Sequence, residues 1–430
     1  MGNGMASASS AGRLRIVAAL RHPGYRWFWL GTLASVMGFQ VLNASQGWLV
    51  YDITGDSLAL GFTGLAVAVP SILLNLFGGA IADRLDRRKV IAIAQVATGV
   101  LVGLLGVLTI TGVIEVWHII VIAFSTGALG AFDAPARQAL FPVLVPREDL
   151  PSAVALNSIV WQSTRILGPA TAGIVVAALG AGPAFLGATV GFALLVIIVL
   201  TLKVPTVPRR PGNLLREMGE GLKFIAANRI FALLIGMTFF NSMFGMSYIL
   251  LMPVFAKDVL GAGPEGFGAL VAASGVGALC GTVIAGALGG GRWRAWVILG
   301  GAALFGGFLI LFSMSSSYPM AVTFVLLAGV CNSTYMIATM TTLQMLVPDA
   351  YRGRVMGFFN MTYNLMPLGA MVGGAITRFW GVQAALAMGG ALVALFSLAA
   401  ALSNARLRGL GTLVEERASA VGPRPEVARH

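Results

Sequence analysis

The sequence predicts an all-α membrane protein of twelve transmembrane helices arranged in two pseudo-symmetric six-helix bundles. Three observations lead to this fold class: an apolar composition, twelve long apolar stretches and a one-sided distribution of basic residues. Of 430 residues, 57% are hydrophobic and 10% are charged, whereas soluble domains average roughly 45 to 50% apolar and 25% charged residues. A chain of this composition needs an apolar solvent, which the interior of a bilayer supplies.

The twelve apolar stretches each have the length of a membrane span. A helix crosses roughly 30 Å of hydrocarbon with about 20 apolar residues. The run after Arg26 is longer than the core of a signal peptide and lacks an obvious cleavage site, so we expect it to be retained as the first span. We predict spans at 27–50, 57–80, 89–112, 117–140, 153–177, 182–202, 229–254, 265–289, 295–315, 319–343, 354–377 and 382–403.

Basic residues lie on one side of the predicted spans. With both termini in the cytoplasm, 25 of the 28 lysines and arginines fall in cytoplasmic segments, Lys257 and Arg378 fall on the opposite side, and Arg165 is embedded. Lysine and arginine are enriched in cytoplasmic loops, so the split predicts an even number of spans in a cytoplasmic (inner) membrane. The net charge of +12 therefore reflects topology, and we expect no nucleic-acid partner.

The longest polar connection lies near the middle of the chain and divides it into two similar halves. We predict a cytoplasmic segment at 1–25, a six-helix bundle at 26–203, a cytoplasmic linker at 204–228, a second bundle at 229–404 and a tail at 405–430. LeuValPro at 144–146 recurs at 346–348, and the string at 48–55 loosely matches that at 252–261. An offset of half the chain is typical of parallel repeats in transporters.

The most specific motif follows the second predicted span and reads Gly79-Ala-Ile-Ala-Asp83-Arg84-Leu-Asp86-Arg87-Arg88-Lys89. It resembles the signature loop of the major facilitator superfamily, G-x-x-x-D-R-x-G-R-R, with Asp86 in place of the second glycine. The resemblance implies the major facilitator fold and places Asp83 at the N-terminal end of the eleventh span, where free N–H groups and the helix dipole favour an anion. A basic turn that only holds topology is the alternative. We expect a conformational latch of Gly79, Asp83, Arg84, Arg87, Arg88, Arg352 and Arg354.

The fourth predicted span contains an acid, within Ala131-Phe132-Asp133-Ala134-Pro135-Ala136-Arg137-Gln138-Ala139-Leu140. This string resembles the FDAPARQA-type segment of the superfamily branch that includes the enterobactin exporter and predicted multidrug efflux proteins. Intramembrane acids are functional candidates by default. Asp133 can pair with Arg137 one turn later or with Arg87 of the loop, and the resemblance favours Arg87. A conformational salt bridge and a titrating proton site both remain open.

The fifth predicted span contains Arg165-Ile-Leu-Gly168-Pro169-Ala-Thr-Ala-Gly173. It resembles the G-P-x-x-G-G motif of antiporter members, with relaxed spacing. Proline removes a backbone hydrogen bond and glycine permits close packing, so a hinge at Gly168, Pro169 and Gly173 is predicted, with an ordinary kink as the alternative. Arg165 is costly to expose to lipid, and we expect it to face the interior and to pair with Asp133 or with backbone carbonyls.

In the superfamily that these motifs resemble, spans 1, 4, 7 and 10 line the cavity. On these spans, amides, aromatic rings and adaptable methionines would suit a large amphipathic cargo. Hydrogen bonds between helices are the alternative for each amide. The candidates are Gln40, Asn43, Gln46, Phe239, Asn241, Phe244, Tyr248, Asn332, Tyr335, Met336 and Met340.

The chain has no G-x-x-x-x-G-K-[ST] phosphate loop, so ATP is not expected as the direct energy source. We expect a secondary-active exporter, an antiporter that moves a drug-like compound or siderophore-type metabolite by alternating access; the proton drive is implied by resemblance. An uptake permease or lipid flippase, or more distantly a non-transporting sensor, are alternatives. The histidines lie at span ends or at the terminus, so we expect no enzyme, cofactor or metal site. The expected partners are cargo, membrane lipids and a proton, and the expected state is a monomer.

Overall fold

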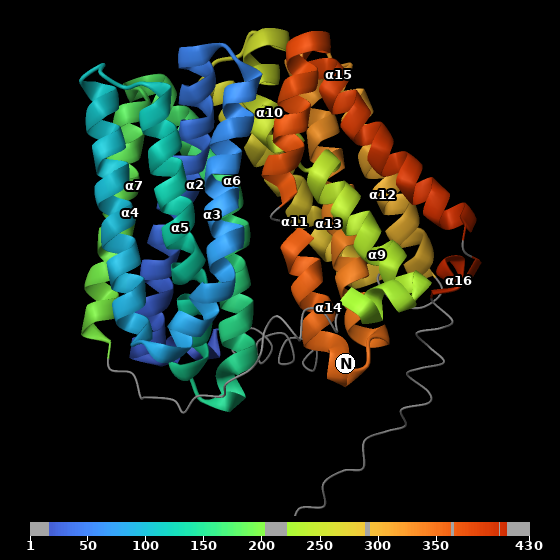
Figure 1. Cartoon of the computed structure of the whole chain (residues 1–430), viewed down its shortest axis with the longest axis horizontal. Helices are drawn as coiled ribbons and strands as arrows, with labels where there is room; N and C mark the ends of the chain where they lie inside the picture. The colour runs from blue at the N-terminus through green and yellow to red at the C-terminus, as the bar shows by residue number, and fades with distance from the viewer. Residues whose placement is uncertain (1–16, 203–221, 289–292, 363–364, 404, 411–430) are drawn as a thin grey trace, which may run out of the picture. The chain divides into compact units, whose positions relative to one another are not determined.

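The computed structural model describes residues 17–202, 222–288, 293–362, 365–403 and 405–410; within these ranges, the side chains of 75–84, 349–350, 352–353, 360 and 405–406 are not described. The described chain consists of helices joined by short turns and contains no strand (Figure 1). The predicted N-terminal segment, most of the predicted linker and most of the predicted tail lie outside these ranges.

The chain divides into two compact units. Unit 1 comprises Met1–Gly212 and Met252–Ala272, and unit 2 comprises Asn213–Leu251 and Ala273–His430. The segment Met252–Ala272 therefore packs with the first half of the chain, although the sequence places it in the second predicted bundle. The predicted bundle boundaries at 26–203 and 229–404 remain predictions.

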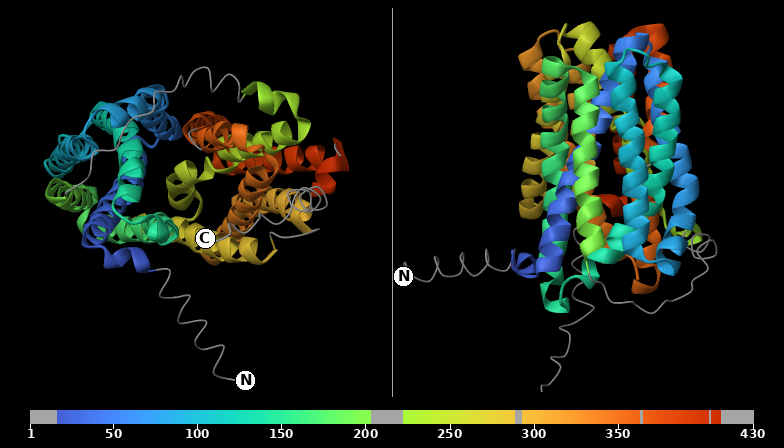
Figure 2. Two further views of the ribbon diagram at one scale, coloured as in Figure 1. Left: turned by 90° about the horizontal axis from the view of Figure 1, so that it is seen from below. Right: turned by 90° about the vertical axis from the view of Figure 1, so that its left-hand side faces the viewer.

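Unit 1 is built from long helices that run side by side, as the right-hand view of Figure 2 shows. The α-helices are α2 (Pro23–Thr54), α3 (Ser57–Arg84), α4 (Arg87–Ile110), α5 (Val116–Leu140), α6 (Leu150–Leu179) and α7 (Ala181–Thr201). Short 3-10 turns are η1 (Ala18–Arg21), η2 (Phe141–Val143) and η3 (Arg147–Asp149). The segment Met252–Ala272 adds the end of α10 (Tyr248–Val254), the π-turn η5 (Phe255–Val259) and the start of α11 (Pro264–Leu288).

Small residues let the helices of unit 1 approach closely. α3 packs on α5, and α2 and α4 both pack on α7. A methyl group on Gly127 of α5 would lie 2.4 Å from the backbone oxygen of Val67 on α3, and one on Gly191 of α7 would lie 2.3 Å from that of Ala34 on α2. In lipid, where hydrophobicity does not drive helices together, this close van der Waals contact holds the bundle.

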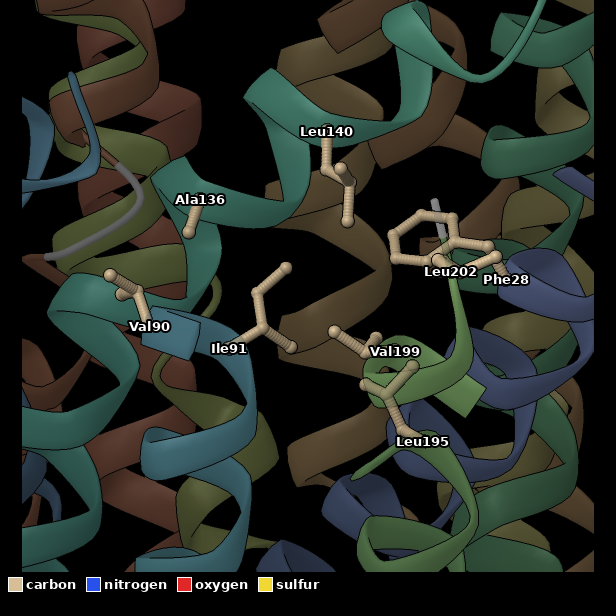
Figure 3. Packing of buried hydrophobic residues seen from close by; sticks show 8 residues of the cluster. All are labelled: Phe28, Val90, Ile91, Ala136, Leu140, Leu195, Val199 and Leu202. Atoms are coloured by element: carbon tan, nitrogen blue, oxygen red, sulfur yellow. The ribbon is translucent and has the colours of Figure 1, made fainter. Parts of the chain in front are cut away.

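Buried apolar side chains from α2, α4, α5 and α7 meet in one cluster (Figure 3). Val90 and Ile91 lie in the first turns of α4, and Leu202 directly follows α7, so the cluster lies where the predicted cytoplasmic ends of these helices meet. Its members are Phe28, Val90, Ile91, Ala136, Leu140, Leu195, Val199 and Leu202. We name these eight residues the apolar cluster.

Unit 2 contains less regular helices. Its seventh predicted span consists of α9 (Arg229–Phe240), the π-turn η4 (Asn241–Gly245) and α10. The other helices are α11 from Ala273 on, α12 (Arg294–Ser313), α13 (Tyr318–Leu346), α14 (Asp349–Thr362), α15 (Met366–Ser403) and α16 (Ala405–Arg408). α12 packs on α13 and α15. Gly381, with φ of 83°, divides α15 into two helical parts.

The all-α membrane class is confirmed. Nine helical spans in the described part of the chain are long and apolar enough to cross a membrane, and one of them, α15, covers part of the eleventh and all of the twelfth predicted span. α2 and α6, with 32 and 30 residues, cover the first and fifth predicted spans. The described part of each of the twelve predicted stretches therefore falls mainly on helix, but the seventh contains the π-turn η4 and the eleventh is shared between α14 and α15.

Candidate functional site

α5 carries an acid and a base one turn apart inside the predicted fourth span. Nε of Arg137 donates to Oδ2 of Asp133 at 2.6 Å, and the two side chains are 13% and 14% exposed. Residues four apart lie on one face of a helix, so this pairing follows from local geometry. Of the two partners that the sequence left open for Asp133, the structure brings Arg137 to it.

Two polar side chains from other helices extend this ion pair. Nη2 of Arg137 donates to Oγ of Ser35 on α2 at 2.9 Å, and that hydroxyl donates to Oε1 of Gln95 on α4 at 2.8 Å. Ser35 and Gln95 are both buried. Hydrogen bonds therefore join α2, α4 and α5 inside unit 1. We name Ser35, Gln95, Asp133 and Arg137 the polar network.

The polar network lies in apolar surroundings. Ala136 of the apolar cluster adjoins Arg137 in sequence, and Phe132 packs against the cluster. Within the described residues, Oδ1 of Asp133 and Nη1 of Arg137 have no hydrogen-bond partner and almost no exposed surface. A buried ion pair depends strongly on both members, because removal of one leaves an uncompensated charge. The carboxylate oxygen Oδ1 can therefore accept a proton or a hydrogen bond from a new donor.

Sequence reasoning missed Ser35 and Gln95. Each is a polar residue inside an apolar stretch, which is a signal because polar side chains within a membrane commonly bond between helices. The signal is not selective, since Thr32 on α2 and Thr98 on α4 share it and are also buried. Only the packing of α2 and α4 on α5 distinguishes the two residues that reach Arg137.

Two expected partners of Asp133 lie elsewhere. Arg87 donates from Nη1 to the backbone oxygen of Ala139 at 2.8 Å, so it contacts the last turn of α5 and not the carboxylate. Arg165 on α6 is half-buried and forms no hydrogen bond or ion pair with the residues that the structure describes. The expected pairing of Arg165 with Asp133 or with backbone carbonyls is not among the contacts of the described residues, and it stays a prediction. A role of Arg165 in coupling stays a prediction.

Asp86, which replaces a glycine of the family motif, holds the loop before α4. Its Oδ1 accepts from the backbone N–H of Arg88 at 3.0 Å and thereby caps α4, while Oδ2 pairs with Nη2 of Arg88 at 3.0 Å. The hydrogen bond from the Arg88 side chain holds the pKa of the Asp86 carboxyl below its usual range. Nη1 of Arg88 also donates to the backbone oxygen of Leu202, which ties the loop to the end of α7.

Asp86→Ala is expected to lower the melting temperature at pH 7. Loss of the helix cap costs about 1 kcal/mol, and the partly exposed ion pair adds little. Because the folded pKa is lowered, this stability is present above the unfolded pKa of about 3.9 and is lost as the pH falls through the folded pKa. Thermal unfolding of the purified protein should therefore differ from the parent at pH 7 and converge with it in strong acid. Equal melting temperatures at pH 7 would contradict the capping role.

The remaining latch residues are only partly described. Gly79, Asp83, Arg84 and Arg352 lie in helices, at positions whose side chains are not described. The guanidinium carbon of Arg354 lies 5.4 Å from the ring centre of Tyr351. The latch stays a prediction that rests on the motif.

The glycine–proline segment of α6 makes two close helix contacts. Pro169 lies inside the helix. A methyl group on Gly168 would lie 2.3 Å from Cβ of Gln40 on α2, and one on Gly173 would lie 2.6 Å from the backbone oxygen of Pro264 at the start of α11. Both glycines therefore let other helices approach α6. The hinge movement of Gly168, Pro169 and Gly173 stays a prediction.

Gly173→Ala is expected to destabilise unit 1, whereas Gly187→Ala on α7 is not. The first methyl group would meet the α11 backbone, and overpacking costs about 1–3 kcal/mol. Nothing lies within 4 Å of the second, and alanine in a helix is favoured over glycine. Melting temperatures of the two variants, measured in the same detergent, check the difference. A Gly173→Ala protein as stable as the Gly187→Ala control would contradict the close approach.

The predicted cavity residues divide by exposure. Gln46 donates from Nε2 to the backbone oxygen of Ile119 at 3.5 Å, and the hydroxyl of Tyr248 hydrogen-bonds to Ser274, so these two serve packing inside their own units. The fully buried candidates are Gln46, Asn241, Tyr248, Tyr335 and Met336. The candidates with accessible surface are Gln40, Asn43, Phe239, Phe244, Asn332 and Met340. The cavity role of both groups stays a prediction.

Comparison of the whole chain with known families identifies it. A family model described as "Transmembrane secretion effector" matches residues 15–429. The chain belongs to the major facilitator superfamily. This member is a multi-pass membrane transporter and not an enzyme.

Several curated transporters of this superfamily are similar in sequence. The staphyloferrin A transporter of Staphylococcus aureus (strain NCTC 8325 / PS 47) is 27% identical over 60% of this chain and 66% of its own length. Macrolide efflux protein A of Streptococcus pyogenes is 23% identical over 80% of this chain and 86% of its own. The enterobactin exporter EntS of Escherichia coli O139:H28 is 24% identical over 79% of this chain and 81% of its own length. The branch expected from the motifs is thereby confirmed.

Solved structures share the fold. A bacterial homologue of the human lysosomal transporter Spinster, inward-facing and unoccupied, gives a TM-score of 0.70 at 14% identity over 92% of this chain and 98% of its own. A D-xylose–proton symporter gives a TM-score of 0.67 at 14% identity over 88% of this chain and 97% of its own. At such identity, these structures support the major facilitator fold and nothing finer.

Proposed function

We propose that this transporter is a secondary-active exporter of a small amphipathic molecule, either a drug-like compound or a siderophore-type metabolite. The polar network carries the proposal: Asp133 is an acid inside a predicted span, paired with Arg137 and with a free Oδ1 among the described residues. Acids in such positions mark proton relays in transporters. Similarity to proteins named for macrolide efflux and enterobactin export supports the outward direction.

Proton binding would change the pairing inside the network. A protonated Asp133 no longer attracts Arg137 as an anion, and the guanidinium would then be held by Ser35 and its neighbour Gln95. Because these residues lie on α2, α4 and α5, a change of partner alters how three helices pack. Such a change is what alternating access needs, with two bundles rocking about a central site. The latch around Asp83 would hold the cytoplasmic side in one of the two states.

The accessible cavity candidates fit the proposed cargo. Asn43 and Asn332 offer amide hydrogen bonds, while Phe239, Phe244 and Met340 offer adaptable apolar surface. We place the protein in the cytoplasmic membrane with both termini in the cytoplasm, because the basic residues gather on one side of its spans. We propose a monomer as the transporting state.

Inside-out vesicles with an acidic interior test the proposal. A panel of macrolides and siderophores is added outside, and at least one compound should accumulate inside in a manner abolished by a protonophore. Accumulation that ignores the protonophore would exclude proton coupling. Accumulation only in right-side-out vesicles would replace export by uptake. Asp133→Asn in the same vesicles reports whether the network is required.

A further inference from the structure

Within unit 1, the segment Met252–Ala272 is held to α2 by a pair of polar contacts. Nζ of Lys257 lies 2.6 Å from Oδ1 of Asp52. The adjacent hydroxyl of Tyr51 donates to Oδ2 of Asp258. Two consecutive residues at the end of α2 thus bind two consecutive residues of the π-turn η5.

These contacts join the two strings that repeat in the sequence, at 48–55 and 252–261. Lys257 is one of only two cations predicted on the side opposite the basic loops. Lysine is uncommon in loops on that side of a membrane protein. The ion pair with Asp52 gives this lysine a structural role there.

A close-packed apolar layer lies next to the polar contacts. The ring centres of Trp48 and Phe267 are 5.9 Å apart. A methyl group on Gly173 of α6 would lie 3.0 Å from Cα of Gly268 on α11, so these two backbones nearly touch. The aromatic pair packs the segment against α2, and the glycine crossing packs it against α6.

We propose that Tyr51, Asp52, Lys257 and Asp258 form an outer clamp that opens and closes the transport path on the side opposite the basic loops. The clamp rests on the proposed alternating access and assigns residues to one of its two states. Its ion pair is suited to release, because Asp52 and Lys257 are 52% and 41% exposed and water can solvate both when they separate. The close-packed layer beside it excludes water only while the clamp is closed.

Asn43 offers a position from which opening can be measured. It lies on α2 one turn before Gly47, whose added methyl group would be 3.9 Å from the ring of Pro253 in the clamped segment. Residues four apart share a helix face, and Asn43 is exposed. At 1.5 Å per residue, it lies roughly 13 Å from Asp52 toward the basic loops. A cysteine there is therefore shielded from the outer side while the clamp is closed.

The test measures labelling of Asn43→Cys by a membrane-impermeant maleimide added to right-side-out vesicles, in a background with Cys280→Ala and Cys331→Ala. Lys257→Asp should speed labelling about fivefold, since an exposed pair biases a two-state equilibrium by roughly that factor. Tyr51→Phe, which introduces no charge, should speed it less but in the same direction. Unchanged rates in both variants would overturn the clamp.

Charge exchange separates a specific pair from general disturbance. Asp52→Lys combined with Lys257→Asp restores attraction and should return labelling to the parental rate. Arg378→Asp makes the same change of charge at the other cation predicted for this side and should leave the rate unchanged. Fast labelling in the exchanged pair, or equally fast labelling in Arg378→Asp, would also overturn the proposal. The assay needs no cargo or gradient, so its outcome is distinct from that of the export assay.

Discussion

Asp133→Ala is expected to abolish gradient-driven flux and to lower the melting temperature more than any other substitution considered for this transporter. The change leaves the Arg137 guanidinium in apolar surroundings, with Ser35 as its remaining hydrogen-bond partner among the described residues. Breaking a buried pair by removing one member costs about 3–5 kcal/mol. Thermal unfolding in detergent and flux in proteoliposomes measure the two effects separately.

Two further variants divide the roles of Asp133. Asp133→Asn keeps the shape of the side chain but cannot bind and release a proton. Flux should therefore fall even if the variant folds normally. Removing both charges, with Asp133→Leu and Arg137→Met, should recover stability because no unpaired charge remains, yet flux should stay absent. Full gradient-coupled transport by Asp133→Asn would falsify both the proton-site and the ion-pair hypotheses.

Asp83→Asn is expected to lower flux at least about tenfold while expression and melting temperature stay near those of the parent. A hydrogen bond that involves a charged group contributes about 1.5–3 kcal/mol, and the proposed latch at the start of the eleventh span is made in only one conformation. The loss should therefore appear in the transport cycle and not in folding. Initial rates in proteoliposomes, normalised to the reconstituted protein, measure it.

Asp86→Asn provides the matched control in the same loop. Asparagine still caps α4, and the substitution removes the same unit of charge three residues further on. Its flux should stay close to that of the parent. If Asp83→Asn transports normally, or if the two variants lose flux equally, the motif does not act as a latch through Asp83.

The helical stretches could be predicted because span length and hydropathy are local properties of the sequence. The π-turn η4 could not, because it depends on packing within unit 2. A methyl group on Gly369 of α15 would lie 1.4 Å from the backbone oxygen of Met243 in η4. The bulged backbone of η4 thus approaches a helix more than a hundred residues away, and no periodicity in the span itself signals this.

In the candidate site, too, contacts within one helix could be predicted from the sequence and contacts between helices could not. Asp133 and Arg137 lie four residues apart on one predicted helix, so their pairing needs no knowledge of other helices. Arg165 was expected to pair with Asp133 or with backbone carbonyls because an embedded cation needs a partner. That rule does not identify which residue the partner is. The cavity candidates were chosen by span and residue type, and burial then separated Gln46 and Tyr248 from accessible residues such as Asn43.

The sequence by itself determined the membrane class and the helical character of the apolar stretches, because each depends on composition or on spacing along one helix. It offered Arg137 and Arg87 as partners of Asp133, and the structure selected Arg137. The tertiary structure decided that Ser35 and Gln95 complete the polar network and that Lys257 meets Asp52. These contacts join residues 60 to 205 positions apart. Their formation depends on which faces the helices bury against one another, and small residues such as Gly173 and Gly191 set how closely those faces approach.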